Sequence, residues 1–335
     1  MKEFNIAILG ATGAVGREML KVLEEYNIPV KKLLPLASAR SAGGTVPFKG
    51  REIVIEEATE QSFEGMDFVL GAVKNGMSKK FAPAIVKSGA VYIDNSSAFR
   101  MEPNVPLVVP EINGEDAFKN EGIIANPNCS SIITLMAVSG IAKLSPIKNM
   151  VACTYQAVSG AGQPGLQELE EQMAALAAGE KPVAKTFPTQ IALNVIPFIG
   201  AELDNLYTDE EMKMQNEGRR ILHLPELKVT CSCVRVPVMR SHSIAVTLRT
   251  ERKVTVEEAK EAVRNYPGCR LIEDYEGRNY PTPLDTSDQD LVWVGRIRED
   301  LTDDNGLTLW CCGDQIRKGA ASNAVQILKL LAERE

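Results

Sequence analysis

Short apolar runs, each followed by a turn or a helical repeat, dominate the first part of the chain. The run Asn5-Ile6-Ala7-Ile8-Leu9 has the length of a strand, and Val15, Met19, Val22 and Tyr26 recur after it at helical spacing. Further strand-like runs lie at residues 33–37, 53–55, 68–70, 91–93 and 123–125, and residues 79–88 are helical in pattern. This alternation predicts an α/β fold with a doubly wound parallel sheet of the Rossmann type.

After Pro146 the pattern changes to longer runs in which apolar residues alternate. These runs predict the strands of a mainly antiparallel sheet, at residues 151–158, 229–236, 244–248, 292–297 and 307–311. Three helices are predicted between them. The first ends at Gly179, and the other two begin with capping boxes at Thr208 and Thr255. A final helical segment, 318–332, follows the last strand.

The length of 335 residues exceeds what one core usually supports, so two domains are expected. We predict a Rossmann-type domain of residues 1–128 and an α+β domain of residues 129–313. The C-terminal segment 314–335 is predicted to form a helix that packs back on the first domain.

Composition excludes several kinds of partner. A net charge of −7 disfavours nucleic acid and anionic membranes, because both demand a basic surface. No window approaches ~18 consecutive apolar residues, and the N-terminal residues lack the apolar core of a signal peptide, so we expect a cytoplasmic protein. Seven cysteines are an odd number and do not suggest a disulfide framework.

No metal site is predicted. The chain has two histidines, and neither Cys231-Ser232-Cys233 nor Cys311-Cys312 has the C-x-x-C spacing of a zinc site. We interpret these four cysteines as packing residues.

The glycine-rich turn after the first strand predicts a dinucleotide site. Its residues allow the backbone to approach a pyrophosphate at the start of the following helix; they are Gly10, Thr12, Gly13, Ala14, Val15 and Gly16. After the second strand the chain reads Ser38-Ala39-Arg40-Ser41, with no acidic residue for a ribose 2′-hydroxyl. An arginine flanked by hydroxyls suits a 2′-phosphate, which favours NADP over NAD. A solvated loop arginine is the alternative.

Cys129 is the candidate nucleophile. It lies where Asn126-Pro127-Asn128 gives way to a helical segment, and unpaired backbone N–H groups at a helix start favour thiolate over thiol. From the residue alone, a small buried core cysteine is the alternative.

Other polar residues lie at predicted strand ends or on a helix face. Gln156 precedes the loop Ser159-Gly160-Ala161-Gly162, Arg235 ends one strand, and His242 begins the next. Glu210 and Lys213 form an i, i+3 pair, which is by itself compatible with a surface ion pair. His242 taken alone is equally compatible with a structural histidine.

Together these motifs resemble the aspartate-β-semialdehyde dehydrogenases, in their shorter bacterial branch. The similarity runs from Gly10 to Asp314-Gln315, and its most specific parts are Asn126-Pro127-Asn128-Cys129-Ser130, residues 154–162, and Arg235-Val236-Pro237 with His242. The resemblance implies NADP-dependent, reversible conversion of L-aspartyl 4-phosphate to L-aspartate 4-semialdehyde through a cysteine thioester. This step leads to lysine, threonine and methionine.

The resemblance also implies the roles of individual residues. Cys129 would be the nucleophile and Gln156 an orienting group. His242 would be a general acid/base, because the unperturbed histidine pKa of ~6.5 suits proton transfer in either direction near neutrality. Arg235 would bind the substrate carboxylate and Glu210 the ammonium group. Phosphate would be held by Arg100, Asn128 and Lys213, whereas Glu211 would serve as the helix cap. Ser159 and Gly160 would bind the cofactor, and Gln315 would close over its nicotinamide side.

Two other functions stay open. N-Acetyl-glutamyl-phosphate reductase shares this architecture, but its acylated substrate offers no cation to Glu210, and its motif reads Asn-Pro-Gly-Cys-Tyr. A non-catalytic dinucleotide-binding homologue would be expected to have lost the thiol, the imidazole or the arginine. The resemblance further implies a homodimer or a homotetramer.

Overall fold

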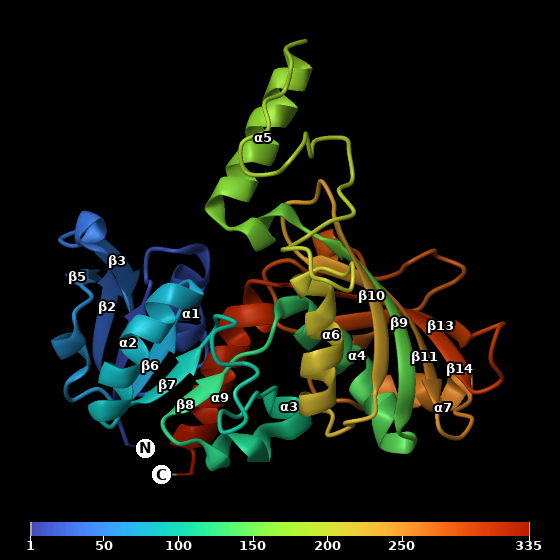
Figure 1. Ribbon diagram of the computed structural model, residues 1–335, viewed down its shortest axis with the longest axis horizontal. Coiled ribbons are helices and arrows are strands. Elements are labelled where there is room, and N and C mark those ends of the chain that lie inside the picture. The colour runs from blue at the N-terminus through green and yellow to red at the C-terminus, as the bar shows by residue number, and fades with distance from the viewer. Residues whose placement is uncertain (1, 335) are drawn as a thin grey trace. The chain divides into compact units, whose positions relative to one another are not determined.

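The computed structural model describes residues 2–334, which divide into two compact units (Figure 1). The first unit comprises the described residues up to Asn128 together with those from Ala320 onward, and the second is Cys129–Gly319. Residues 314–319, which the sequence analysis assigned to the first domain, therefore cluster with the second unit. Their side chains bond there to residues 240–241 and 288–290.

A six-stranded parallel sheet forms the centre of the first unit, in the order β5-β2-β1-β6-β7-β8. Its strands are β1 (Phe4–Leu9), β2 (Val30–Ala37), β5 (Glu56–Glu57), β6 (Phe68–Gly71), β7 (Val91–Asp94) and β8 (Ile123–Ala125). The helices of this unit are α1 (Ala14–Glu25), α2 (Asn75–Lys87), α3 (Pro110–Asn113) and α9 (Ser322–Ala332), with short 3₁₀ turns at Ala39–Ser41, Glu60–Phe63 and Gly114–Lys119. The predicted Rossmann-type architecture is thereby confirmed.

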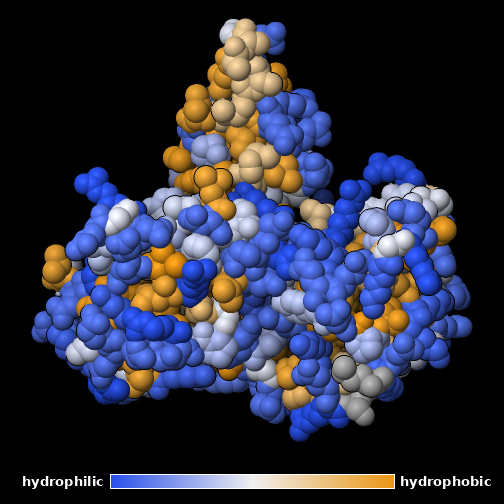
Figure 2. All heavy atoms as spheres, turned by 180° about the vertical axis from the view of Figure 1, so that it is seen from behind, coloured by the Kyte–Doolittle hydropathy of each residue, from blue (hydrophilic) through white to orange (hydrophobic). Residues whose placement is uncertain are grey.

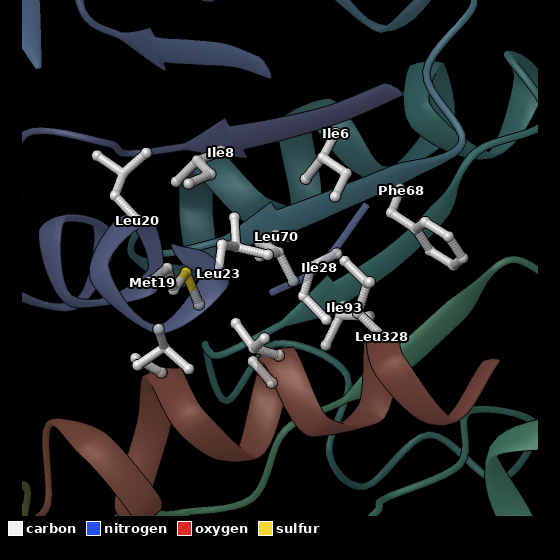
Figure 3. Close-up of a cluster of buried hydrophobic side chains, with 14 of the residues drawn as sticks. Ile6, Ile8, Met19, Leu20, Leu23, Ile28, Phe68, Leu70, Ile93 and Leu328 are labelled. Carbon is white, nitrogen blue, oxygen red and sulfur yellow. The ribbon is translucent and has the colours of Figure 1, made fainter. Parts of the chain in front are cut away.

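Successive residues of each strand point to opposite faces of this sheet and are covered by different helices. On one face, strand residues pack against Met19, Leu20 and Leu23 of α1 and Leu328 of α9 (Figure 3). On the other face, the alternate strand residues pack against α2. Both faces are buried, which explains why these strands are almost continuously apolar in sequence.

One predicted strand lies outside this sheet. Residues 53–55 were predicted to belong to the parallel sheet, but β4 (Arg51–Val54) pairs antiparallel with β3 (Thr45–Phe48) in a separate hairpin. Lys49 and Gly50 both have positive φ, 48° and 72°, as a tight hairpin turn requires. Apolar content alone does not distinguish such a hairpin strand from a buried parallel one.

The second unit contains a mixed six-stranded sheet in the order β10-β9-β11-β14-β13-β12. Its strands are β9 (Ile147–Gln156), β10 (Lys228–Arg235), β11 (His242–Thr250), β12 (Cys269–Leu271), β13 (Val292–Glu299) and β14 (Gly306–Gly313). The three central pairings are antiparallel, as predicted, but both edge strands, β10 and β12, pair parallel to their neighbours.

The helices of the second unit are α4 (Cys129–Leu144), α5 (Gln163–Ala177), α6 (Asp209–Ile221), α7 (Val256–Arg264) and α8 (Pro283–Thr286), with a 3₁₀ turn at Val158–Ala161. Helix α4 is buried around its circumference and contacts α6, α7 and strands of the sheet. The capping boxes at Thr208 and Thr255 begin α6 and α7 as predicted.

Helix α5 extends away from the sheet of its own unit (Figure 1). It ends before Gly179, whose φ is 73°, as predicted. Buried Glu168 and Gln172 accept hydrogen bonds from backbone N–H groups of the segment after α5, so this segment is held against the helix. Within residues 2–334, no helix combines the length and the apolar character needed to cross a membrane.

Candidate active site

Cys129 is the first residue of α4, as the switch from turn to helix predicted. The helix has 16 residues, so its first backbone N–H groups and its dipole act on a half-buried thiol. This position favours the thiolate, which is the nucleophilic form of cysteine.

The imidazole of His242 lies beside this sulfur. Its Nε2 atom is 3.4 Å from Cys129 Sγ, although the two residues are 113 positions apart in the chain. On the other side of the ring, the backbone N–H of Ala157 donates to Nδ1 at 3.1 Å. Since a backbone N–H can only donate, Nδ1 is an acceptor and the neutral ring carries its proton on Nε2, toward the sulfur.

The surroundings keep His242 neutral. Complete burial, followed by the positive charge of Arg235, lowers the pKa of His242 from 6.5 to about 3. The pKa of His242 therefore lies well below the unperturbed value of ~6.5 from which the sequence analysis argued. A neutral ring with its proton on Nε2 can stabilise negative charge on sulfur or on a nearby oxygen, but it cannot accept the thiol proton at that same nitrogen.

Gln156 and Glu210 form the next part of the site. Gln156, the buried last residue of β9, donates from Nε2 to Glu210 Oε1 at 3.2 Å and accepts a hydrogen bond from Thr154 Oγ1 at 3.0 Å. Thr154 was not singled out from the sequence as a site residue. Its position two residues before Gln156 puts both side chains on one face of the strand, and this spacing is the signal that could have found it.

Lys213 belongs to the same group of charges. Its ammonium lies 2.9 Å from Glu210 and 3.1 Å from Asp209. Burial opposes the positive charge, but the two carboxylates outweigh it, so the pKa of Lys213 is raised. Adjacent Glu211 instead accepts from the backbone N–H groups of Thr208 and Cys233, which agrees with its predicted role as the cap.

Arg235 ends β10 and is buried near His242. Its Nη1 donates to the carbonyl of Ala157 at 2.7 Å, and its guanidinium carbon lies 5.8 Å from the centre of the Phe187 ring. Burial is the largest influence on its pKa, which is lowered. The N–H of Ala157 thus fixes the imidazole of His242, and the carbonyl of Ala157 fixes the guanidinium of Arg235. Ala157 was not identified from the sequence as a site residue.

Three predicted cofactor residues lie in this unit as well. A Cβ atom on Gly160 would be 2.8 Å from Arg235 Nη1 and 3.5 Å from His242 Cε1, so a side chain does not fit there. Gln315 donates to Ser159 Oγ and accepts from the backbone N–H of Ser241, the residue before His242. The second unit therefore brings together nine predicted residues, namely Cys129, Gln156, Ser159, Gly160, Glu210, Lys213, Arg235, His242 and Gln315.

In the first unit, the glycine-rich turn has the tight geometry of a dinucleotide-binding loop. Gly10 has φ of 96°, and a Cβ there would lie 2.5 Å from the Ala72 carbonyl oxygen; a Cβ on Gly16 would lie 2.2 Å from the Gly10 oxygen. Helix α1 begins after Gly13 with no acidic residue in its first turn, so its N–H groups can face an anion. The turn Gly10–Gly16 thus fits a pyrophosphate, with Thr12, Ala14 and Val15 inside it.

The other predicted residues of the first unit have different environments. Ser38, Arg40 and Ser41 form an accessible turn at the carboxyl end of β2, where a ribose phosphate can be reached. Arg100 is buried and donates to the backbone carbonyls of Asn126 at 2.9 Å and Asn95 at 2.8 Å. This guanidinium therefore holds the backbone that leads to Asn128 and Cys129, a role that was not anticipated.

Comparison with known proteins identifies the family. Residues 5–120 match the profile "Semialdehyde dehydrogenase, NAD binding domain", and residues 138–318 match "Semialdehyde dehydrogenase, dimerisation domain". The aspartate-semialdehyde dehydrogenase of Synechocystis is 49% identical over 98% of this chain and 97% of its own length.

The chain belongs to the aspartate-semialdehyde dehydrogenase family. The enzyme of Aquifex aeolicus is 47% identical over 98% of both chains. A crystal structure of aspartate semialdehyde dehydrogenase II from Vibrio cholerae, complexed with ASA, is 41% identical, has a TM-score of 0.97 and covers 99% of both chains. As in this family, the first unit is a domain that binds a nicotinamide dinucleotide and the second contains the dimerisation domain.

Proposed function

We propose that the protein catalyses the reversible, NADP-dependent conversion of L-aspartyl 4-phosphate and NADPH to L-aspartate 4-semialdehyde, NADP and phosphate. The observation that carries this proposal is the Cys129–His242 pair at 3.4 Å, flanked by Gln156, Glu210 and Arg235. A non-catalytic homologue would not need to retain this set, and the 41–49% identical relatives have the same named activity over nearly their full length.

The chemistry begins with attack of the Cys129 thiolate on the acyl phosphate carbonyl. A C–S bond forms, the C–O bond to phosphate breaks, and phosphate leaves with the electron pair and takes up one proton from water. Bound NADPH supplies the hydride that reduces the resulting thioester. The thiohemiacetal oxyanion then re-forms its C=O bond and expels the Cys129 thiolate, so no net proton transfer to a side chain is needed.

The role of His242 follows from its tautomer. Its Nε2–H points to the sulfur and can donate to the oxyanions that form beside it. We therefore propose a fixed hydrogen-bond donor in place of the general acid/base expected from the resemblance. Gln156, held by Thr154 and Glu210, would orient the acyl group.

Substrate recognition is proposed from charge. The planar guanidinium of Arg235 suits the α-carboxylate, and the Glu210 carboxylate suits the α-ammonium. Lys213, Arg100 and Asn128 would bind the phosphate. Any contact of Arg100 with phosphate would come in addition to its bonds to the carbonyls of Asn95 and Asn126.

For the cofactor we propose NADP, bound by the turn Gly10–Gly16 with Arg40 and its flanking hydroxyls on the 2′-phosphate. Ser159, Gly160 and Gln315 would contact the nicotinamide portion. We further propose that two copies of the chain form a homodimer, since the second unit contains the family's dimerisation domain; a tetramer would be a dimer of such dimers.

The decisive experiment follows absorbance at 340 nm with purified protein, NADP, phosphate and L-aspartate 4-semialdehyde, omitting each component in turn. NADPH formation that requires phosphate supports the proposal. Formation without phosphate would indicate an aldehyde dehydrogenase that hydrolyses its thioester. Activity only with N-acetyl-glutamate semialdehyde would instead identify an N-acetyl-glutamyl-phosphate reductase.

A further inference from the structure

A glycine far along the chain is packed directly on the nucleophile. If Gly319 carried a Cβ atom, that atom would lie 2.8 Å from Cys129 Cβ and 3.3 Å from Cys129 Cα. Neither of these atoms belongs to the movable end of a side chain, because both are fixed by the first turn of α4. The backbone of Gly319 therefore packs directly against Cys129 and limits where the Cys129 side chain can lie.

The position of Gly319 is set by one turn of π-helix at Arg317–Ala321. Its N–H donates to the carbonyl of Asp314 at 2.9 Å, a bond that spans five residues instead of four. Such wide turns are rare and occur frequently at functional sites. The π-turn brings the backbone of Gly319 against Cys129.

Asp314 holds the beginning of this segment. Its carboxylate is completely buried and accepts four hydrogen bonds. Oδ1 accepts from the backbone N–H groups of Ile316 at 2.8 Å and Arg317 at 3.0 Å, whereas Oδ2 accepts from the backbone N–H of Asp288 at 2.6 Å and from Arg240 Nε at 2.5 Å. A buried carboxylate with this many donors is a rigid anchor.

The same segment also holds the residues just before His242. Arg240 pairs with Asp314, and Ser241 donates its N–H to Gln315 Oε1 at 2.8 Å. Ser241 has φ of 74°, a left-handed conformation that a non-glycine residue keeps only when its surroundings impose it. Gln315 therefore helps to keep the chain in the strained conformation from which His242 enters β11.

A second ion pair fixes the segment from the other side. Arg317 donates from Nε and Nη2 to the two carboxylate oxygens of Asp290, at 2.8 and 3.0 Å. This two-point geometry leaves little freedom to either side chain. Residues 314–319 are thus bound at Asp314, Gln315 and Arg317. They pack against Cys129 through Gly319 and bond to Ser241, the residue before His242, through Gln315.

From this arrangement we infer that Gly319 and Asp314 are positioning residues: together they set the spacing between the Cys129 sulfur and His242 Nε2. Neither residue supplies a reacting group. Gly319 limits the position of the Cys129 thiol through van der Waals contact. Asp314 holds the N–H of Gly319 with its backbone carbonyl, and it holds Arg240, two residues before His242, with its carboxylate. The inference rests on the proposed function, in which Cys129 is the nucleophile and His242 its hydrogen-bond donor.

The test compares Gly319→Ala with Gly218→Ala. Both substitutions add one methyl group to a helical glycine of the second unit, but at Gly218 the methyl would meet only the ends of Leu227 and Leu135, at 3.3 and 3.6 Å. A displacement of a reacting group by about 1 Å can cost about 100-fold in rate. We expect kcat of Gly319→Ala to fall about 10- to 100-fold with KM for both substrates within about threefold, and kcat of Gly218→Ala to stay within about twofold of wild type.

A second measurement reports the thiol itself. The rate at which iodoacetamide alkylates Cys129, followed by mass spectrometry of the peptide that contains it, is recorded against pH for each variant. In Gly319→Ala we expect slower alkylation at pH 7 and a midpoint shifted upward, toward the ~8.5 of a free cysteine. Wild-type kcat and an unchanged alkylation profile in a folded Gly319→Ala protein would overturn the inference, as would a rise of KM in parallel with the loss of kcat.

If Gly319→Ala does not fold, Asp314→Asn takes its place. This substitution preserves shape and one acceptor oxygen but removes the charge that pairs with Arg240. It should again lower kcat selectively and shift the alkylation profile, and wild-type behaviour would refute the role of Asp314. Alkylation needs no substrate, so failure of the proposed reaction in wild-type protein is distinguishable from failure of this inference.

Discussion

At the scale of single residues, the site consists of a thiol at a helix start and an imidazole fixed by backbone. Helix α4 favours negative charge on Cys129, and the N–H of Ala157 forces the His242 proton to the side that faces the sulfur. Both effects stabilise the same ion, the thiolate. In the proposed reaction, hydrogen bonding and the helix dipole together stabilise the Cys129 thiolate that attacks the substrate.

The first prediction concerns the thiol. Cys129→Ala should abolish turnover, by at least about 10³-fold, because no thioester can form. Binding of NADP, measured by titration calorimetry, should stay within a factor of about two, since the glycine-rich turn lies in the first unit. Residual turnover within tenfold of wild type would contradict covalent catalysis by Cys129.

The second prediction concerns stability against pH. Burial holds the pKa of His242 at about 3 in the folded state, whereas the unfolded chain has a pKa of ~6.5. The unfolded state therefore binds the additional proton between these values, and stability falls as pH decreases below about 6.5. At pH 5 this one group costs about 2 kcal/mol relative to neutral pH.

His242→Gln removes the titrating group and serves as the comparison for this effect. Between pH 7.5 and 5, urea unfolding should show a smaller loss of stability in the variant than in wild type. Other groups titrate equally in both proteins. The difference between the two plots of unfolding free energy against pH is therefore due to the titration of His242. Superimposable pH dependences would show that His242 is not buried in its neutral form.

At the scale of elements, the loops that follow the parallel strands all lie at the carboxyl ends of those strands. This is where doubly wound sheets bind ligands. The turn after β1 contains Gly10 and packs against Gly16 near the start of α1, and the turn after β2 contains Arg40. The first turn has the shape for a pyrophosphate in either nicotinamide cofactor. In the proposed cofactor site, the second turn is the one that meets the ribose 2′-phosphate.

The third prediction therefore concerns Arg40→Ala. Loss of a charge-assisted contact to the 2′-phosphate should raise KM for NADP about 10- to 100-fold and leave KM for NAD nearly unchanged. Arg51→Ala, which removes another exposed arginine of the same unit, is the matched control and should leave both constants unchanged. Equal effects of Arg40→Ala on the two cofactors would argue against NADP selectivity through this residue.

Local signals explain which elements the sequence could predict. The capping boxes at Thr208 and Thr255 and the glycine after α5 act within four residues, so the C-terminal end of α5 and the starts of α6 and α7 were predictable. Cys129 was predictable for the same reason, because its turn and its helix are contiguous. In contrast, residues 53–55 were misassigned because a short apolar run does not specify its partner strand.

Contacts between distant segments explain what the sequence could not show. The environment of His242 depends on Ala157 and Arg235, which reach it only through the pairing of β9, β10 and β11. Gly319 looks like an ordinary small residue in a helical pattern, since a π-turn leaves no evident sequence signal. Its importance emerges only when the fold places Cys129 against it.

At the scale of the whole molecule, the segment of the second unit that follows α5 exposes several large hydrophobic side chains. The large hydrophobic residues exposed in this segment are Val183, Leu193, Val195, Phe198, Leu203 and Leu206. Figure 2 shows hydrophobic residues gathered on the surface of the projecting α5 region. Burial of such surface by a second copy is favourable, and it accords with a dimerisation domain over residues 138–318.

The last prediction tests this surface with two valines of equal exposure. Val195 in the second unit and Val54 in the first are each 56% exposed, so replacement by glutamate changes hydration equally in the isolated chain. If the segment after α5 pairs with a second copy, Val195→Glu must place a charge in an apolar contact and shift the protein from dimer toward monomer. Val54→Glu should remain dimeric. Sedimentation velocity at several concentrations distinguishes the two, and an unchanged dimer in both variants would place the interface elsewhere on the second unit.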